Sequence, residues 1–255
     1  YSLAATLLKD FSWGMSLVAS YIFSHAYSVC DVPSTSSSSN WNRTYALDLN
    51  NPSLTFSAYD IPHKVSVAVA YNKRYSPLFD INASLVYQAT SGQRYSLCVG
   101  EAVDFNGDSA YGSTLMYIPT EQELQRMLFA DGSSREKWNN YIEDDAYLRS
   151  HRGSFAERNA MQTPMEHRLD LHLSHGFYFS RQSSRKVELS IDVMNLGNLI
   201  CRHWGAYNVS GVRLQPVTIS ATEDGQPVYR FTGAEPSPSD LLSRWHMQIG
   251  ARIVF

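Results

Sequence analysis

The sequence predicts an all-β fold, the antiparallel β-barrel of a transmembrane protein. Three observations support this prediction: apolar and polar residues alternate along many segments, short and long connections alternate between those segments, and aromatic residues gather at the segment ends. Aromatic residues make up 13% of the chain, a composition that favours strands. Alternation by itself also fits a soluble sandwich or a lipocalin-like barrel, so the connections must decide.

Seven segments alternate with a period of two residues, the pattern of strands that have one apolar face. In the last segment the odd positions from 245 to 255 are all apolar, whereas the even positions include His246, Gln248 and Arg252. We expect strands at about 2–9, 13–29, 61–74, 79–98, 166–180, 186–195 and 243–255.

Connections between these segments alternate strictly in length. Those at 10–12, 75–78 and 181–185 are short, and those at about 30–60, 99–165 and 196–242 are long. Outer-membrane barrels have tight turns in the periplasm and long loops outside the cell, and a soluble sandwich has no reason to follow this rule. We therefore expect a bacterial outer-membrane protein whose long loops are extracellular.

Aromatic residues with a polar rim prefer the headgroup level of a membrane. We predict a periplasmic girdle near the short connections, formed by Phe11, Trp13, Tyr71, Tyr75, Phe79, Phe177, Tyr178, Phe179 and Phe255. Phe23, Tyr27, Tyr95 and Trp245 would mark the outer girdle.

Bulk properties exclude several classes of protein. A formal net charge of -3 argues against a nucleic-acid-binding protein, because such proteins need clustered Lys and Arg on one face. A spanning helix needs about 20 consecutive apolar residues, and the best candidate, 17–23, is short and interrupted by Ser20. Because His151 beside Arg152, and His172 near Asp170, lack a nucleophile at a recognisable spacing, we predict no enzymatic activity.

Cys30, Cys98 and Cys201 are too few and too widely spaced for a disulfide framework or a zinc site. We interpret them as isolated small residues, although one disulfide among them stays open because all three fall at the same ends of their expected strands. The chain begins without Met or a signal peptide, within an alternating stretch, so we expect a mature piece or a fragment.

The loop at 99–165 contains two helix signals. Thr120 and Glu123 form a capping box, with Gly132 as the expected helix end, and an apolar helical face at Trp138, Tyr141 and Ile142 follows Ser134. We expect a folded lid whose role is ligand capture, docking of a partner such as a surface lipoprotein, or shielding of the barrel mouth.

Asp104, Asn106 and Asp108 place three oxygen ligands at alternate positions, as at the start of a calcium loop of the EF type. Leu115 stands where the twelfth-position Glu would be. Calcium is thus one interpretation, and a polar turn held by side-chain hydrogen bonds is the other.

Two sets of motifs resemble known families. Gln248, Gly250, Ile253 and Phe255 resemble the carboxy-terminal β-signal that the outer-membrane assembly machinery recognises. The segments that resemble the Oar-like branch of the TonB-dependent receptors are DIPHKV at 60–65, DFNGD at 104–108, LMYIP at 115–119, YLRSHRG at 147–153, RN at 158–159, DVMNLGNL at 192–199 and WG at 204–205. The family's usual second Gly in the 104–108 motif is replaced by Ser109.

This resemblance implies the last seven strands of a 22-stranded barrel, with residues 1–255 as its carboxy-terminal portion and with the plug, the TonB-contacting segment and the early strands outside this chain. Expected partners are those strands and the plug, the TonB energy-coupling system, outer-membrane lipid and a surface lipoprotein at the loops. The function implied is uptake of an unidentified ligand. The alternatives are a structural or adhesion scaffold with the same architecture, and a barrel hydrolase.

Polar residues on the inward face of the last three strands would form charge ladders and contact the plug. They are Arg168, Asp170, His172, Lys186, Glu188, Asp192, Arg244, His246 and Arg252. Interior polar packing is favoured over direct ligand contact, and the ligand-binding residues themselves are not predicted.

Overall fold

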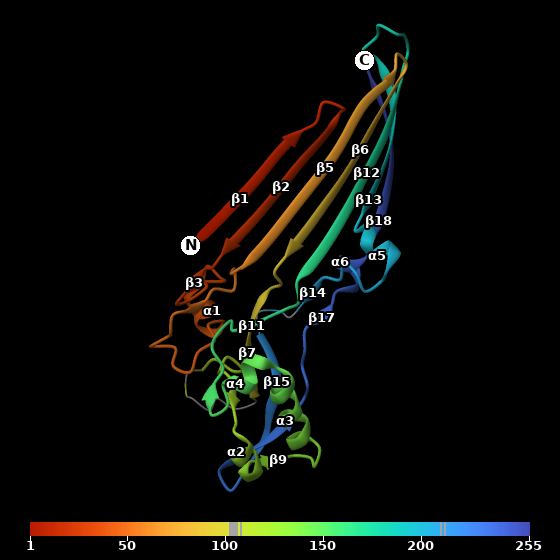
Figure 1. Cartoon of the computed structure of the whole chain (residues 1–255). Helices are drawn as coiled ribbons and strands as arrows, with labels where there is room; N and C mark the ends of the chain where they lie inside the picture. Colours follow the sequence, from red (N-terminus) through yellow and green to blue (C-terminus); the bar gives the residue numbers. More distant parts are fainter. Residues whose placement is uncertain (102–106, 108, 210, 212) are drawn as a thin grey trace.

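The computed structural model describes residues 1–101, 107, 109–209, 211 and 213–255. Its largest element is an antiparallel sheet with strand order β1-β2-β5-β6-β12-β13-β18 (Figure 1). These strands are Ser2–Asp10, Met15–Ser24, His63–Ser76, Phe79–Thr90, Glu166–Tyr178, Lys186–Met194 and His246–Val254. All seven expected strands are therefore present, and each pairs with the next one along the chain.

The register places all the apolar sets on one face of this sheet. Leu171 in β12 pairs with Leu85 in β6 and with Val193 in β13, and Val193 in turn pairs with Met247 in β18. Because side chains alternate between faces with a period of two, the in-register pairing continues the apolar face across neighbouring strands. These side chains are not sealed in a protein core: Ile191 is 41% exposed and Ile249 is 71% exposed.

The connections alternate as expected. Three tight turns lie at one end of the sheet, and the three long segments lie at the other (Figure 1). We call these the short-turn end and the long-loop end. Among the described residues β1 and β18 pair on one side only, so the sheet is open.

Two of the expected strands are too long. β2 ends at Ser24, because the chain turns there and Tyr27–Ser28 forms β3 with β4 (Thr55–Phe56). β6 ends at Thr90, and β7 (Arg94–Glu101) belongs to a different sheet. Both strand ends were predicted too late for the same physical reason. The apolar pattern continues beyond the bend, and the bend is imposed by contacts between residues that are distant in the sequence.

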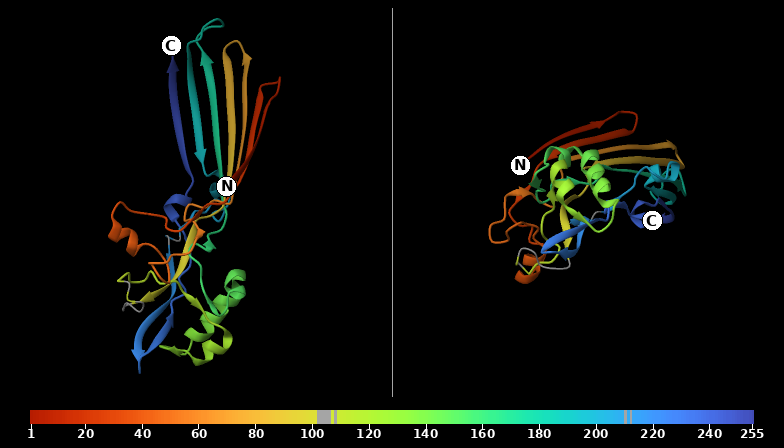
Figure 2. Two further views of the ribbon diagram at one scale, coloured as in Figure 1. Left: turned by 90° about the vertical axis from the view of Figure 1, so that its left-hand side faces the viewer. Right: turned by 90° about the horizontal axis from the view of Figure 1, so that it is seen from below.

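A compact unit continues beyond the long-loop end (Figure 2), and we call it the loop module. It contains a five-stranded sheet of order β11-β7-β15-β16-β9, in which the strands besides β7 are Met161–Gln162, Arg213–Glu223, Gln226–Phe231 and Leu128–Phe129. The helices α2 (Glu121–Arg126), α3 (Ser134–Asp144) and α4 (Ala146–Ser150) and a hairpin of β8 (Tyr117–Ile118) with β10 (Ser154–Phe155) complete it.

The main buried core of the described residues lies in the loop module and not in the seven-stranded sheet. Leu97, Ile118, Ile142 and Leu148 are fully buried there, and Trp138 is 1% exposed. Burying each such side chain stabilises the unit by about 1.5–3 kcal/mol. The expected folded lid is therefore present as a packed unit.

The helix signals were largely correct. The capping box at Thr120 forms, with both reciprocal hydrogen bonds, and α3 begins at Ser134 and buries Trp138 and Ile142. The expected end at Gly132 is wrong: α2 ends at Arg126, because Met127 is extended and Leu128–Phe129 pairs with β16 as β9.

Short elements link the two parts. They are α1 (Ser37–Asn42), α5 (Leu196–Ile200), α6 (Asp240–Ser243) and a pair formed by β14 (Asn208–Val209) and β17 (Ser237–Pro238). Within the described ranges, the helices are all too short or too polar to span a bilayer.

Candidate ligand pocket at the long-loop end

A buried ion pair joins the seven-stranded sheet to the loop module. Asp60, just before β5, is 1% exposed and accepts hydrogen bonds from Arg94 at the start of β7, with Nε at 3.0 Å and Nη2 at 2.8 Å. The backbone N–H of Ala26 donates to the other carboxylate oxygen at 2.8 Å. Since a buried carboxylate is costly unless it is paired, these contacts fix the end of β2, the start of β5 and the start of β7 together.

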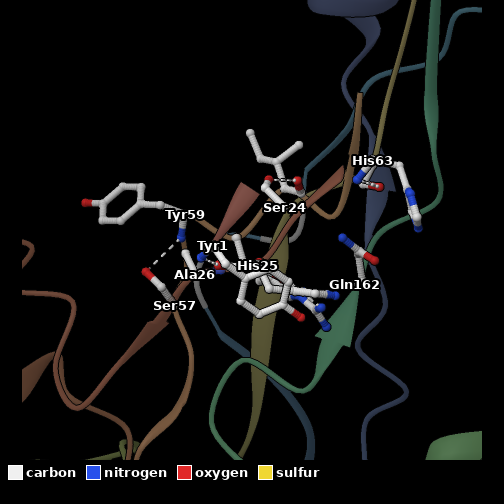
Figure 3. A network of polar contacts seen from close by, with 12 residues as sticks. Tyr1, Ser24, His25, Ala26, Ser57, Tyr59, His63 and Gln162 are labelled. Atoms are coloured by element: carbon white, nitrogen blue, oxygen red, sulfur yellow. Dashed lines mark hydrogen bonds and ion pairs between the residues drawn. The ribbon is translucent and has the colours of Figure 1, made fainter. Parts of the chain in front are cut away.

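Figure 3 shows the surroundings of this pair. The amino group of Tyr1 donates to the His25 carbonyl at 3.0 Å, and the Ser24 hydroxyl donates to the Ile61 carbonyl at 2.7 Å. The backbone N–H of His63 donates to the hydroxyl of Ser91 at 3.0 Å, so the segment that leaves β6 is also held against the start of β5.

A second set of buried contacts involves Arg158 and Asn159. Asn159 is 1% exposed and has a left-handed φ of 57°, which Asn tolerates better than most residues. Its Nδ2 donates to Oδ2 of Asp31 at 2.9 Å and to the Phe56 carbonyl at 2.8 Å. The Arg158 guanidinium donates to the carbonyls of Ser28 and Val29. We call Asp31, Asp60, Arg94, Arg158 and Asn159 the junction cluster.

The carboxylate of Asp31 organises the loop between β2 and β5. Burial would raise its pKa, but donors from Ser28, Ser57, Asn159 and the Ala58 backbone outweigh that effect and lower the pKa below its usual value. The carboxylate is therefore ionised at neutral pH and its oxygens are already used within the protein.

A cavity of about 970 Å³ lies beside the junction cluster. Its lining includes three tyrosines, Tyr45, Tyr59 and Tyr111, and three arginines, Arg43, Arg94 and Arg213. Ligand pockets in proteins typically measure about 300–1,000 Å³ and combine aromatic walls with a few placed polar groups. This cavity has both properties, and it draws its lining from segments that are far apart in the sequence.

The charges of the pocket are not all balanced by the residues that the structure describes. Asp60 neutralises Arg94, whereas Arg43 and Arg213 form no ion pair with any described residue. The Arg213 guanidinium donates to the Gly112 carbonyl at 2.6 Å and lies 5.9 Å from the ring centre of Tyr45. Burial raises the pKa of Tyr45, and the charge of Arg213 opposes this rise, so the phenol is neutral at physiological pH.

The polar residues expected on the inward face do lie on the face opposite to the apolar one, but they form separate pairs and no single site. Nδ1 of His172 lies 2.6 Å from Oδ1 of Asp192 on the neighbouring strand. Near the short-turn end, Nζ of Lys186 lies 2.9 Å from Asp80 and 2.7 Å from Glu188. The His172–Asp192 pair joins neighbouring strands, as the sequence suggested, whereas Asp80 lies in β6, two strands from Lys186, and Glu188 lies on the same strand as Lys186.

Other members of that set are placed differently. Arg168 pairs with Asp170 two residues along its own strand, at 3.0 Å, and not across strands. Arg244 precedes β18, which begins at His246, and pairs with Asp240 in α6 because the chain is still helical one turn earlier. Arg252 lies in β18 opposite Glu188.

The residues of the expected β-signal lie in or directly after β18. Gln248 pairs with Asp192 and Gly250 pairs with Ser190, on the inner side of this edge strand, and Phe255 follows the strand end at 90% exposure. Their recognition by an assembly machinery stays a prediction. Asp104, Asn106 and Asp108 lie outside the described residues, so the calcium interpretation also stays a prediction.

The three cysteines form no disulfide with one another, in agreement with their interpretation as isolated residues: Cys98 is buried in the loop module, Cys30 is half-buried and Cys201 is exposed. Cys98 lies in β7, outside the seven-stranded sheet, so the three do not share one strand-end level.

The aromatic residues at the short-turn end mostly gather on the apolar face. Trp13 packs against Phe11 and Tyr71, and Phe79 packs against Tyr75 and Phe177. Tyr178 is an exception, because it lies on the polar face and donates to Asp80 at 2.7 Å. Tyr95 is not a girdle residue, since it is 5% exposed in the core of the loop module.

Three histidines on the apolar face each have a tyrosine partner, which the sequence did not predict. The hydroxyls of Tyr21, Tyr87 and Tyr75 lie 2.8, 2.8 and 2.7 Å from ring nitrogens of His63, His167 and His175. A polar ring atom that faces lipid needs a partner from the protein. The pairing of tyrosine with histidine across strands supplies it.

An antiparallel sheet with an apolar outer face, a polar inner face, tight turns at one end and long folded connections at the other defines the class of outer-membrane β-barrel proteins. The chain belongs to the outer membrane beta barrel domain family, whose model matches residues 1–201. It is therefore an outer-membrane protein. Neither the curated proteins nor the solved structures contain a match to it.

The sequence did not predict the pocket, although some of the residues beside it could have indicated it. Asp60, Arg158 and Asn159 belong to the motifs that carry the family resemblance, and all three are members of the junction cluster beside the cavity. Arg43 and Tyr59 lie in the 30–60 connection and Arg213 begins β15. No recognisable sequence pattern marks these three positions, so only the fold identifies them.

Proposed function

We propose that this chain forms part of the barrel of a TonB-dependent outer-membrane receptor that takes up a ligand, with the long loops outside the cell and the tight turns in the periplasm. The observation that carries the proposal is the combination of an open sheet with a folded, pocket-bearing loop module at one end. The family resemblance of the loop and strand motifs points to the same class of protein. Receptors of this kind transport ligands and catalyse no reaction on them.

The open edges argue for further strands. β1 and β18 each expose one row of backbone N–H and C=O groups, and each unpaired group costs several kcal/mol in a bilayer. Additional strands of the same receptor, 22 in total by resemblance, would pair with both edges and enclose a plug. The inner polar pairs, including His172 with Asp192, would then face that plug and a water-filled interior.

Growth of a deletion strain tests the proposal. The strain is complemented with the full-length gene and grown on single nutrients drawn from glycans, peptides and ferric siderophores, in backgrounds with and without the TonB system. Transport predicts that complementation restores growth on at least one nutrient, and only where the TonB system is intact. If the deletion strain without the gene grows like the wild type on every nutrient but loses surface adhesion or assembly, the scaffold function is favoured instead.

A further inference from the structure

We infer that the 970 Å³ pocket binds a carboxylate-bearing ligand and that Arg43 and Arg213 are its anion-binding groups. This inference rests on the proposed function, because it names the chemistry of the ligand that the receptor would capture.

The polar groups on the buried side of the pocket already have hydrogen-bond partners within the protein. Arg94 is held by Asp60, the Asp31 carboxylate accepts four hydrogen bonds, and Asn159 uses its side-chain amide on Asp31 and Phe56. These groups shape the pocket, but a ligand would have to break existing bonds to use them. They therefore do not select the ligand.

Two further arginines line the pocket, and Arg213 uses one N–H of its guanidinium on the Gly112 carbonyl. Arg43 lies at the end of α1 and Arg213 at the start of β15, and neither forms an ion pair with any residue that the structure describes. The fork of an arginine matches the two oxygens of a carboxylate. The negative charge of Asp31, on the deep side, further favours an anion at the arginines instead of deeper in the pocket.

The volume of the pocket and its tyrosines indicate the size of the ligand and its apolar part. Tyr59 and Tyr111 line the pocket with 69% and 58% of their surface exposed, so their rings are free to contact a ligand. Tyrosine provides a large contact area at a small loss of conformational entropy. Because the volume far exceeds that of an inorganic ion, the expected ligand is a short oligomer with carboxylates and apolar surface, such as an acidic saccharide or an acidic peptide.

Binding to the purified full-length receptor in detergent tests the inference by calorimetry. The probes are trigalacturonate with neutral trigalactose as its control, and triglutamate with triglutamine as its control. We expect at least one acid to bind about tenfold or more tightly than its neutral counterpart, because hydrogen bonds to charged groups are stronger than those to neutral ones. The acid that binds identifies the source of the carboxylate. Raising the salt concentration should weaken this binding.

Variants assign the residues. Arg43→Gln should weaken binding of that acid about tenfold, whereas Arg185→Gln, in a tight turn at the opposite end of the sheet, should leave it unchanged. Arg213 also donates a hydrogen bond to the Gly112 carbonyl, so Arg213→Lys is measured beside Arg213→Gln. Its affinity for the acid should lie between those of the wild type and Arg213→Gln. Equal binding of acids and neutral controls, no binding of either acid, or an unchanged Arg43→Gln would overturn the inference.

Failure of the binding test can be distinguished from failure of the growth test. Calorimetry needs neither cells nor the TonB system. If the acid binds but no nutrient supports growth that depends on the TonB system, only the transport proposal is refuted. TonB-dependent growth together with equal binding of acids and neutral controls would refute only the carboxylate site.

Discussion

The Arg94 guanidinium holds the Asp60 carboxylate with Nε at 3.0 Å and Nη2 at 2.8 Å, and only 9% and 0% of the two side chains are exposed. Removing one partner of such a pair leaves a buried charge and costs about 3–5 kcal/mol. Arg94→Gln should therefore loosen the loop module from the sheet. We expect much faster proteolysis of the module in isolated outer membranes.

A matched control for this variant is Arg244→Gln. Arg244 also pairs with an aspartate, Asp240, but their side chains are 64% and 80% exposed, and an exposed pair is worth about 0–1 kcal/mol. Equal proteolysis rates for Arg94→Gln and Arg244→Gln would contradict the structural role of the buried pair.

The hydrogen bond between Tyr87 and His167 should stabilise the barrel. Tyr87→Phe removes the hydroxyl that lies 2.8 Å from Nδ1 of His167 and leaves that ring atom without its partner on the lipid-facing side. The expected cost is about 1–3 kcal/mol, measured as a lower midpoint of urea unfolding in lipid vesicles. Tyr71→Phe is the control, because Tyr71 lies on the same face and its hydroxyl forms no hydrogen bond within the described residues. Identical midpoints for the two variants would refute the assignment.

Gly197 must lack a side chain because its Cα faces the indole of Trp204. A Cβ at Gly197 would overlap the ring, whereas a Cβ at Gly132 would meet no atom within 4 Å. Gly197→Ala should therefore lower the stability by about 1–3 kcal/mol through overpacking. Thermal unfolding monitored by tryptophan fluorescence measures the difference. Gly132→Ala should be neutral, and a similar loss in both variants would show that the contact is not responsible.

The tyrosines of the loop module should ionise late. Burial raises the pKa of Tyr95 from 10.0 to about 12, with smaller contributions from the charges of Asp145 and Glu235. Burial also raises the pKa of Tyr141. Because the folded pKa lies above the unfolded one, this stabilisation is complete below pH 10 and is lost as the pH rises towards 12.

An absorbance titration at the phenolate band checks this prediction. We expect one phase near pH 10 from exposed tyrosines and a second near pH 12, accompanied by unfolding of the module. Tyr95→Phe should reduce the second phase only. A single phase near pH 10 would mean that the core of the module is accessible to solvent.

Cys201 reports the orientation of the barrel in the membrane. It is exposed and lies at the long-loop end, just after α5. If the long loops are extracellular, a membrane-impermeant maleimide should label Cys201 on intact cells, and Cys201→Ser should abolish that labelling. Ser183→Cys in the Cys201→Ser background places a thiol in a tight turn and should react only after the membrane is disrupted. The reverse pattern would invert the proposed orientation.

The sequence by itself determined the seven strands, their order and the two faces of the sheet. These features depend on local information, namely a period of two residues and the lengths of the connections, so they are readable without coordinates. The capping box at Thr120 was readable for the same reason, since both of its hydrogen bonds lie within four residues.

Only the tertiary structure decided the rest. Arg158 reaches the carbonyl of Ser28 across 130 residues, and Asp60 meets Arg94 across 34. No local pattern encodes such contacts, because they depend on how the loops fold against one another. The same holds for the tyrosine partners of His63 and His167, which the pairing register places on adjacent strands, and for the pocket, whose arginines approach each other only in the folded chain.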